Sequence, residues 1–118
     1  MNPKKPLGDA GEDFAAACLE SRGYRVVARN FRTRLGEVDL IARNEQYLLF
    51  VEVKARKAGA MVTGEEAVDF RKQARLRAAA ETYLVGHPNT LQPRFDVICV
   101  ELGPGGRTTL KNWIEDAF

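Results

Sequence analysis

The stretch GEVDLIARNEQYLLFVEVK, residues 36–54, constrains the fold of this chain most strongly. Two runs rich in β-branched and aromatic residues flank a short polar segment, which is typical of a β-hairpin. Side chains alternate between the two faces of a strand, so a turn at Glu45–Gln46 places Asp39 opposite Glu52. Side chains opposed in this way lie roughly 5 Å apart at Cβ, where two carboxylates repel each other. We therefore predict a pair of like charges on one face of an apolar hairpin.

A divalent cation held by these carboxylates would relieve their repulsion. Mg²⁺ prefers oxygen ligands and usually takes only one or two carboxylates, which Asp39 and Glu52 could supply. The backbone carbonyl of Val53 could add a third oxygen. Lys54 follows Glu52 on the same face, about 6.6 Å along the strand, and could position a water or stabilise charge on a reacting phosphate. The register also places Glu37 opposite Lys54, where it would orient the lysine.

A third carboxylate, Glu12, lies on the first of two predicted helices, which covers residues 9–22 after a loose arm at residues 1–8. Glu12 begins an apolar stripe that continues three, four and seven residues later with Ala15, Ala16 and Leu19. It could complete a capping box with Asp9. It could also reach the hairpin and hold a second metal ion or its water. The two roles are not exclusive.

The second predicted helix spans residues 64–85 and begins with the capping-box pattern of Thr63 and Glu66. Lys72 lies within its apolar stripe, which leaves two interpretations. The long lysine side chain can extend from an apolar face into water. Alternatively, Lys72 or its neighbour Gln73 points at the charged face of the hairpin.

Three other β-prone stretches complete the predicted secondary structure. Residues 24–31 form the first strand, residues 94–102 a nearly continuous apolar strand, and residues 108–114 an edge strand. The order is α-β-β-β-α-β with an extra C-terminal strand, in one domain of 118 residues. The first three strands should form an antiparallel meander, and the strand after the second helix should join in the parallel sense. We therefore predict an α/β fold with a mixed sheet flanked by helices.

Basic residues concentrate in the middle of the chain, although the net charge is only +2. Residues 22–77 contain thirteen Lys or Arg against seven Asp or Glu, a net charge of +6. This distribution fits either a one-sided attraction for polyanions or a solvated mixed surface. If a phosphate backbone is bound, the candidate contacts are Arg29, Arg32, Arg34, Arg56, Lys57, Arg71 and Arg75.

The cysteines and the N-terminus bear on cellular location. Cys18 and Cys99 match no metal or redox spacing and lie in apolar contexts, so we expect free thiols in a reducing compartment. The N-terminus lacks the apolar segment of a signal peptide, and no run approaches the roughly 18 apolar residues of a membrane span. We expect a cytoplasmic protein that does not enter the membrane.

An ordered series of short motifs resembles one group of proteins. The series comprises Gly11-Glu12, Gly23-Tyr24, GEVDLIA at residues 36–42, FVEVK at residues 50–54, Lys72, RFDV at residues 94–97 and DAF at residues 116–118. Asp39 followed by Glu52-Val53-Lys54 is similar to the signature of the PD-(D/E)XK nuclease superfamily. Over nearly its full length the chain resembles the small bacterial YraN family, which is related to archaeal Holliday junction resolvases.

The resemblance implies a restriction-endonuclease-like core, a bound Mg²⁺ or Mn²⁺ ion and hydrolysis of phosphodiester bonds in DNA. It implies that Asp39 and Glu52 are metal ligands and that Lys54 is the catalytic lysine. The other site residues that it implies are Glu12 from the first helix and Lys72 and Gln73 from the second.

Three hypotheses for function remain open. The first is a metal-dependent endonuclease acting on branched or structured DNA, and cutting a symmetric junction would require two sites in a homodimer. The alternative is a nucleic-acid-binding module with the nuclease fold but no cleavage activity, whose DNA binding would depend on salt and not on metal. The third is a structural role, in which the charges form a buried ion-pair network that binds no metal.

Overall fold

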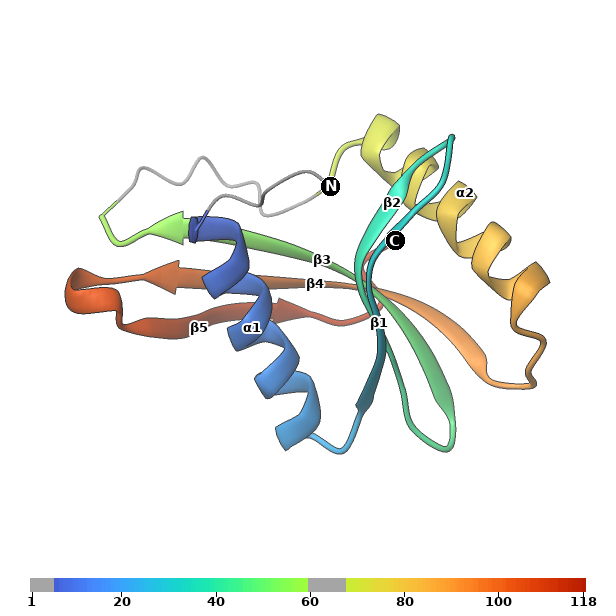
Figure 1. The fold of residues 1–118 in the computed structure, drawn as a ribbon, viewed down its shortest axis with the longest axis horizontal. Helices are drawn as coiled ribbons and strands as arrows, with labels where there is room; N and C mark the ends of the chain where they lie inside the picture. The colour runs from blue at the N-terminus through green and yellow to red at the C-terminus, as the bar shows by residue number, and fades with distance from the viewer. Residues whose placement is uncertain (1–5, 60–67) are drawn as a thin grey trace.

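The computed structural model describes residues 6–59 and 68–118 and contains two α-helices and five β-strands within these ranges (Figure 1). In chain order the elements are α1 (Pro6–Ser21), β1 (Arg25–Arg32), β2 (Glu37–Arg43), β3 (Tyr47–Lys57), α2 (Phe70–Gly86), β4 (Gln92–Leu102), the 3₁₀ turn Pro104–Gly106 and β5 (Thr108–Ile114). This order confirms the predicted α-β-β-β-α-β core with an extra C-terminal strand. None of the helices in the described ranges is long and apolar enough to cross a membrane.

The strands form one mixed sheet in the order β1-β2-β3-β4-β5. β1, β2 and β3 make an antiparallel meander, β4 runs parallel to β3, and β5 is the antiparallel edge strand. Both the meander and the parallel connection through α2 are therefore as predicted. The hairpin register also agrees with the prediction, because Leu40 pairs with Val51 and Arg43 pairs with Leu48.

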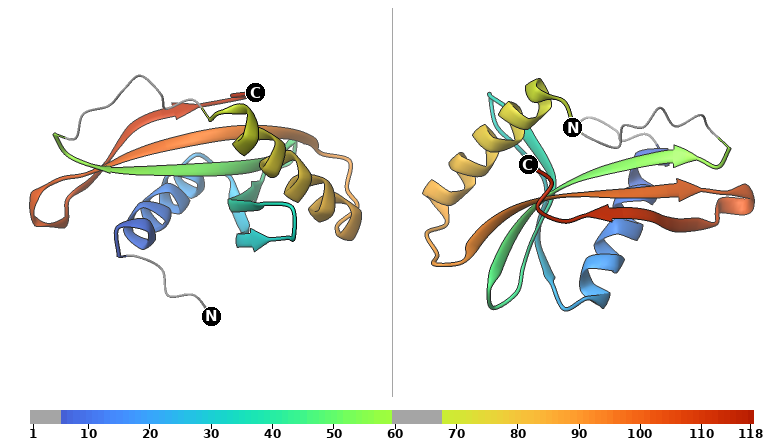
Figure 2. Two further views of the ribbon diagram at one scale, coloured as in Figure 1. Left: turned by 90° about the horizontal axis from the view of Figure 1, so that it is seen from above. Right: turned by 180° about the vertical axis from the view of Figure 1, so that it is seen from behind.

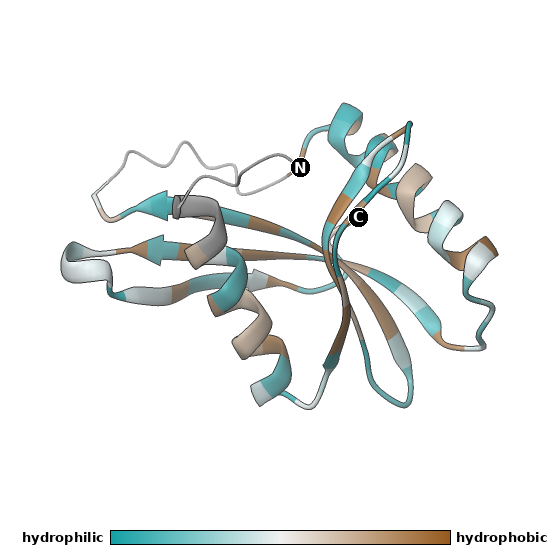
Figure 3. Ribbon diagram, in the orientation of Figure 1, coloured by the Kyte–Doolittle hydropathy of each residue, from teal (hydrophilic) through white to brown (hydrophobic). Residues whose placement is uncertain are grey.

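The two helices cover opposite faces of the sheet, and each face has its own apolar core (Figure 2). The α1 core consists of Ala15, Ala16, Leu19, Leu40, Ala42, Leu49, Val51, Ile98 and Val100. The α2 core includes Val38, Ile41, Leu48, Phe50, Leu76, Ala79, Ala80, Tyr83, Val97 and Cys99. Successive residues of β3 thus enter different cores, which explains the continuous apolar run along this strand (Figure 3).

The first helix begins earlier than predicted. α1 begins at Pro6, so residues 6–8 belong to the helix, and residues 1–5 of the expected arm lie outside the described residues. Proline is favoured in the first turn of a helix, where a backbone N–H has no intrahelical acceptor. Asp9 consequently lies inside α1 rather than at its N-cap, and the predicted capping box of Asp9 and Glu12 is wrong.

The second helix begins later than predicted. α2 begins at Phe70 because Asp69 is its N-cap and accepts a 2.9 Å hydrogen bond from the backbone N–H of Lys72. Residues 68 and 69 are not helical, so a continuous helix from residue 64 is wrong. The expected capping box of Thr63 and Glu66 lies outside the described residues.

Gly36 lies where the β1–β2 turn contacts α2. A Cβ atom at this position would lie 2.6 Å from the carbonyl carbon and 2.9 Å from the Cα of Arg75. Both atoms belong to the backbone of a packed helix and cannot rotate aside, as the end of a side chain could. Only glycine therefore allows the turn to approach α2 this closely.

We expect Gly36→Ala to lower the free energy of unfolding by about 1–3 kcal/mol, because α2 must shift away from the sheet. Denaturant unfolding measures this change. Gly86→Ala is a matched control, since a Cβ there meets no atom within 4 Å. The control should be neutral or slightly stabilising. Equal stabilities of the two variants would contradict the close packing at Gly36.

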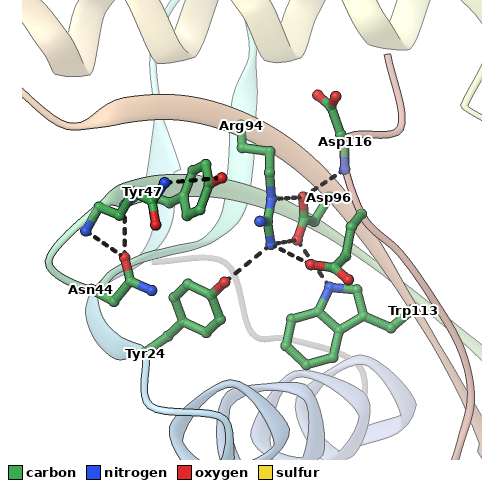
Figure 4. Close-up of polar contacts among 9 residues, drawn as sticks. Tyr24, Asn44, Tyr47, Arg94, Asp96, Trp113 and Asp116 are labelled. Carbon is green, nitrogen blue, oxygen red and sulfur yellow. Dashed lines mark hydrogen bonds and ion pairs between the residues drawn. The ribbon is translucent and has the colours of Figure 1, made fainter.

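A buried carboxylate, Asp96 in β4, connects the C-terminal segment to the sheet (Figure 4). Arg94 donates from Nε to Oδ1 at 2.9 Å and from Nη2 to Oδ2 at 2.8 Å. Trp113 Nε1 donates to Oδ2 at 2.9 Å, and the backbone N–H of Asp116 donates to Oδ1 at 3.0 Å. The hydrogen bond to Asp96 raises the pKa of Arg94, although burial acts in the opposite direction. This cluster is structural and fixes β5 and the C-terminus against β4.

Candidate functional site

The predicted carboxylate pair lies where β2 and β3 separate. The residue pairs between these strands run from Arg43–Leu48 to Leu40–Val51, and beyond them β2 bends toward α2 while β3 continues in another direction (Figure 1). Asp39 immediately precedes the last pair. Its Oδ2 accepts a 2.8 Å hydrogen bond from the backbone N–H of Val53, which lies beyond the last β2–β3 residue pair. The same register places Asp39 across from Glu52.

Lys72 reaches Glu52 from the first turn of α2. The Lys72 Nζ lies 2.5 Å from Glu52 Oε2, with 51% of the lysine side chain and 7% of the glutamate side chain exposed. Burial alone would lower the pKa of Lys72, but Glu52, Asp39 and Glu37 together raise it. Lys72 is therefore a cation in contact with the charged face of the hairpin, and its position in the apolar stripe of α2 follows from that contact.

Asp39 resists ionisation in the metal-free protein. Burial and then the charge of Glu52 raise the pKa of Asp39 to about 8, although its hydrogen bond from Val53 acts in the opposite direction. The charge of Glu12 also contributes to the increase. One lysine bound to Glu52 thus leaves much of the repulsion between the carboxylates in place.

Glu12 approaches this place from α1. Glu12 is only 8% exposed, and the other members of its stripe, Ala15, Ala16 and Leu19, are buried. The preceding Gly11 allows close packing, because a Cβ there would lie 2.8 Å from the Cβ of Ala55 in β3. Glu12 therefore lies on the buried face of the helix, close enough to influence the pKa of Asp39.

Asn30 in β1 contacts this group and was not identified from the sequence. The β1–β2 register places it opposite Asp39, and its Nδ2 donates a 3.3 Å hydrogen bond to Glu12 Oε1. Its φ angle of 52° lies in the left-handed region, which asparagine adopts more readily than most other residues. An asparagine inside a β-prone run was the available signal, since asparagine is depleted in strands.

Three other predicted site residues have surroundings that differ from the expectation. Glu37 Oε2 accepts a 3.1 Å hydrogen bond from Arg32, its direct partner in β1, so the predicted pairing with Lys54 is wrong. Lys54 is half-buried in β3 and forms no ion pair within the described part of the chain. Gln73 donates from Nε2 to the Val68 carbonyl at 2.7 Å, a contact that stabilises the start of α2.

The predicted phosphate contacts are distributed over three regions. Arg29 forms a 2.6 Å ion pair with Asp13, whereas Arg34 lines a pocket of about 440 Å³ beside Thr82 of α2. Arg32 is bound to Glu37, as described above. The remaining members are exposed at the end of β3 and on α2: Arg56, Lys57, Arg71 and Arg75.

The oxygen donors fit a hard divalent ion with few protein ligands. Asp39 and Glu52 supply carboxylates, and the Val53 carbonyl faces the same gap as its N–H, because both groups of an extended residue point to one side. Across residues 6–59 and 68–118, no three acidic, histidine or cysteine side chains gather closely enough to bind one ion together. This set suits Mg²⁺, which completes its shell with water and phosphate oxygens.

Residues 11–100 match the model of the uncharacterised protein family UPF0102. The chain belongs to this family. A UPF0102 protein of Symbiobacterium thermophilum is 47% identical over 113 residues, covering 95% of each chain. A UPF0102 protein of Caldanaerobacter subterraneus is 41% identical over 117 residues, covering 98% of this chain and 96% of the relative. One from Dictyoglomus turgidum is 38% identical over 119 residues and covers both chains completely.

UPF0102 is the YraN family, so the match confirms the predicted family. Membership of the wider nuclease superfamily stays a prediction. The matched region includes every residue of the candidate site, from Glu12 to Lys72.

Proposed function

We propose that this UPF0102 protein is a metal-dependent endonuclease that hydrolyses phosphodiester bonds in DNA with Mg²⁺ or Mn²⁺. The observation that carries the proposal is the pair of carboxylates, Asp39 and Glu52, facing each other where β2 and β3 separate. Their repulsion and burial raise the pKa of Asp39 to about 8, so the arrangement costs stability in the metal-free protein. A bound divalent cation would remove that cost, whereas a structural network gains nothing from opposed carboxylates.

Each residue of the site has a role in this proposal. Asp39 and Glu52 would hold the ion, which supplies Lewis acidity at a phosphate oxygen. Lys54, two residues beyond Glu52 on the same face of β3, would position water or stabilise the negative charge that develops on the phosphate. Glu12 would orient a water from the side of α1, with Asn30 positioning its carboxylate.

DNA as the substrate is supported by the basic excess in residues 22–77 and by the resemblance to the nuclease superfamily. The relation to junction resolvases favours branched or structured DNA. Cutting both strands of a junction would place two such sites in a homodimer.

Cleavage assays with junction, flap and linear duplex DNA test this function. Purified protein is incubated with each substrate in Mg²⁺ and in Mn²⁺, with Asp39→Ala as the control for contaminating nucleases. Cleavage that requires the metal and Asp39 supports the proposal. Equal cleavage by wild type and Asp39→Ala would contradict it.

The ion pair of Lys72 with Glu52 favours a second candidate, a nucleic-acid-binding module that has the fold without cleavage activity. In that case Lys72 permanently takes the place of a cation, and DNA binding continues unchanged in EDTA and in Glu52→Ala. This candidate is supported over the first if wild type and Glu52→Ala both bind DNA and neither cleaves it in Mg²⁺ or in Mn²⁺.

We expect Lys72→Met to bind Mn²⁺ about three- to tenfold more tightly than wild type, because the ion no longer competes with the ammonium group for Glu52. Isothermal titration calorimetry measures the affinity. Lys57→Met is the matched control, since Lys57 is exposed at the far end of β3, and should bind like wild type. Weaker Mn²⁺ binding by Lys72→Met would show that the lysine supports the metal site instead of competing with the ion.

A further inference from the structure

A second basic region lies at the other end of the β1–β2–β3 meander from the carboxylates. A pocket of about 860 Å³, here called the end pocket, is lined by residues 22, 23, 25 and 43–46. These residues belong to the α1–β1 connection, the start of β1, the end of β2 and the β2–β3 turn. Arg43 follows Asp39 by four residues in β2, about 13 Å along the strand. The end pocket is thus separate from the candidate metal site.

Two arginines of the end pocket are opposed in a way that destabilises the sheet. Arg25 and Arg43 are direct partners in the antiparallel β1–β2 ladder, where like charges repel. Neither forms an ion pair with any residue that the structure describes. Glu45 also lines the pocket, but three arginines against one carboxylate leave the lining positive. A bound anion would relieve this repulsion.

The third arginine, Arg22, stacks on an aromatic ring, and its guanidinium donates no hydrogen bond to any residue in the described ranges. Its guanidinium lies 4.3 Å from the centre of the Trp113 ring. Trp113 is itself fixed by its hydrogen bond to Asp96, which Arg94 binds from the other side (Figure 4). A stacked guanidinium keeps its N–H groups available for a phosphate, which it can bind through two hydrogen bonds.

We propose that the end pocket binds backbone phosphates of nucleic acid and holds DNA at a second place beside the metal site. Arg22, Arg25 and Arg43 are the contacts. The inference rests on the proposed function in taking DNA as the ligand, but it requires neither metal nor cleavage. None of these three arginines is needed to hold the carboxylates of the site.

DNA binding measured in EDTA by fluorescence anisotropy tests the end pocket separately from cleavage. The test variant is Arg25→Gln/Arg43→Gln, and the control is Arg107→Gln/Lys111→Gln, which removes two charges near the exposed β4–β5 turn. We expect the test variant to lose roughly tenfold in affinity at moderate salt, and its log–log salt slope to fall by about 2. Its melting temperature should equal or exceed that of wild type, because the opposed charges are gone.

Three results would overturn the proposal. One is an equal loss of affinity in the control, which would mean that only net charge matters. Another is a test variant with unchanged affinity and salt slope. The last is a mononucleotide that binds wild type as tightly as DNA does and no longer binds the test variant. That result would assign the end pocket to a small phosphorylated ligand. If wild type binds DNA through the end pocket but does not cleave it, the result contradicts the proposed function and leaves the end-pocket proposal standing.

Discussion

Replacing Asp39 by asparagine should reduce the proposed DNA cleavage by about 10³-fold while leaving the fold intact, because the proposed metal site would lose one of its two charged ligands. The asparagine side chain keeps an oxygen that can accept the hydrogen bond from the Val53 N–H, so the divergence of β2 and β3 is preserved. Single-turnover cleavage at saturating protein measures the change. Glu20→Gln, an exposed carboxylate on α1, is the control and should cleave like wild type. Cleavage by Asp39→Asn at the rate of this control would contradict the assignment.

The same substitution should stabilise the metal-free protein in a pH-dependent way. The pKa of Asp39 is raised from 3.8 to about 8, so its ionisation costs more in the folded than in the unfolded chain. Wild type therefore loses stability relative to Asp39→Asn as the pH rises from about 4 to 8. We expect similar unfolding free energies at pH 4 and a gain of about 1–3 kcal/mol for the variant at pH 9 in EDTA. A variant that is less stable than wild type at pH 9 would show that the aspartate is a stabilising structural group.

Replacing Arg94 by methionine should have the largest effect on stability, about 3–5 kcal/mol, because it leaves a buried carboxylate without its counter-ion. The Asp96 side chain is fully buried and the Arg94 side chain is 11% exposed, so water cannot replace the lost contacts. The substitution also removes the guanidinium that lies over the rings of Tyr24 and Tyr47, whereas methionine keeps the apolar part of the side chain. Denaturant unfolding followed by circular dichroism measures the loss.

A matched control and a binding measurement separate this structural effect from function. Arg107→Met removes an exposed arginine and should change the free energy of unfolding by no more than about 0.5 kcal/mol. Equal stabilities of the two variants would contradict the role of the Asp96 cluster. Under conditions where Arg94→Met remains folded, its Mn²⁺ binding should match wild type, because Arg94 is not part of the carboxylate pair.

The hairpin was predictable because its pattern leaves one register compatible with a buried core. A shift by one residue would move Leu40 and Val51 out of the α1 core, so the alternation fixes Asp39 opposite Glu52. The α-β-β-β-α-β order follows from equally strong periodic signals. Helix starts were less predictable, since Asp69 is the N-cap of α2 although the sequence also contains a capping-box pattern at Thr63 and Glu66.

The finer contacts of the candidate site depend on where the sheet bends, which local patterns do not encode. Extending the hairpin register as if β2 and β3 stayed paired put Glu37 beside Lys54, whereas the strands separate first and Glu37 contacts Arg32. The left-handed backbone of Asn30 was also missed, because a single asparagine in a β-prone run indicates an unusual strand residue but not the conformation that it adopts.

Calorimetric titration of the metal-free protein with Mn²⁺ at pH 8 distinguishes a metal site from a structural ion-pair network at Asp39 and Glu52. We expect wild type and Glu20→Gln to bind Mn²⁺ and to release protons as Asp39 ionises, and Asp39→Asn to bind at least tenfold more weakly. The absence of any binding by wild type, or equal affinity in Asp39→Asn, would contradict the assignment of Asp39 and Glu52 as a metal site.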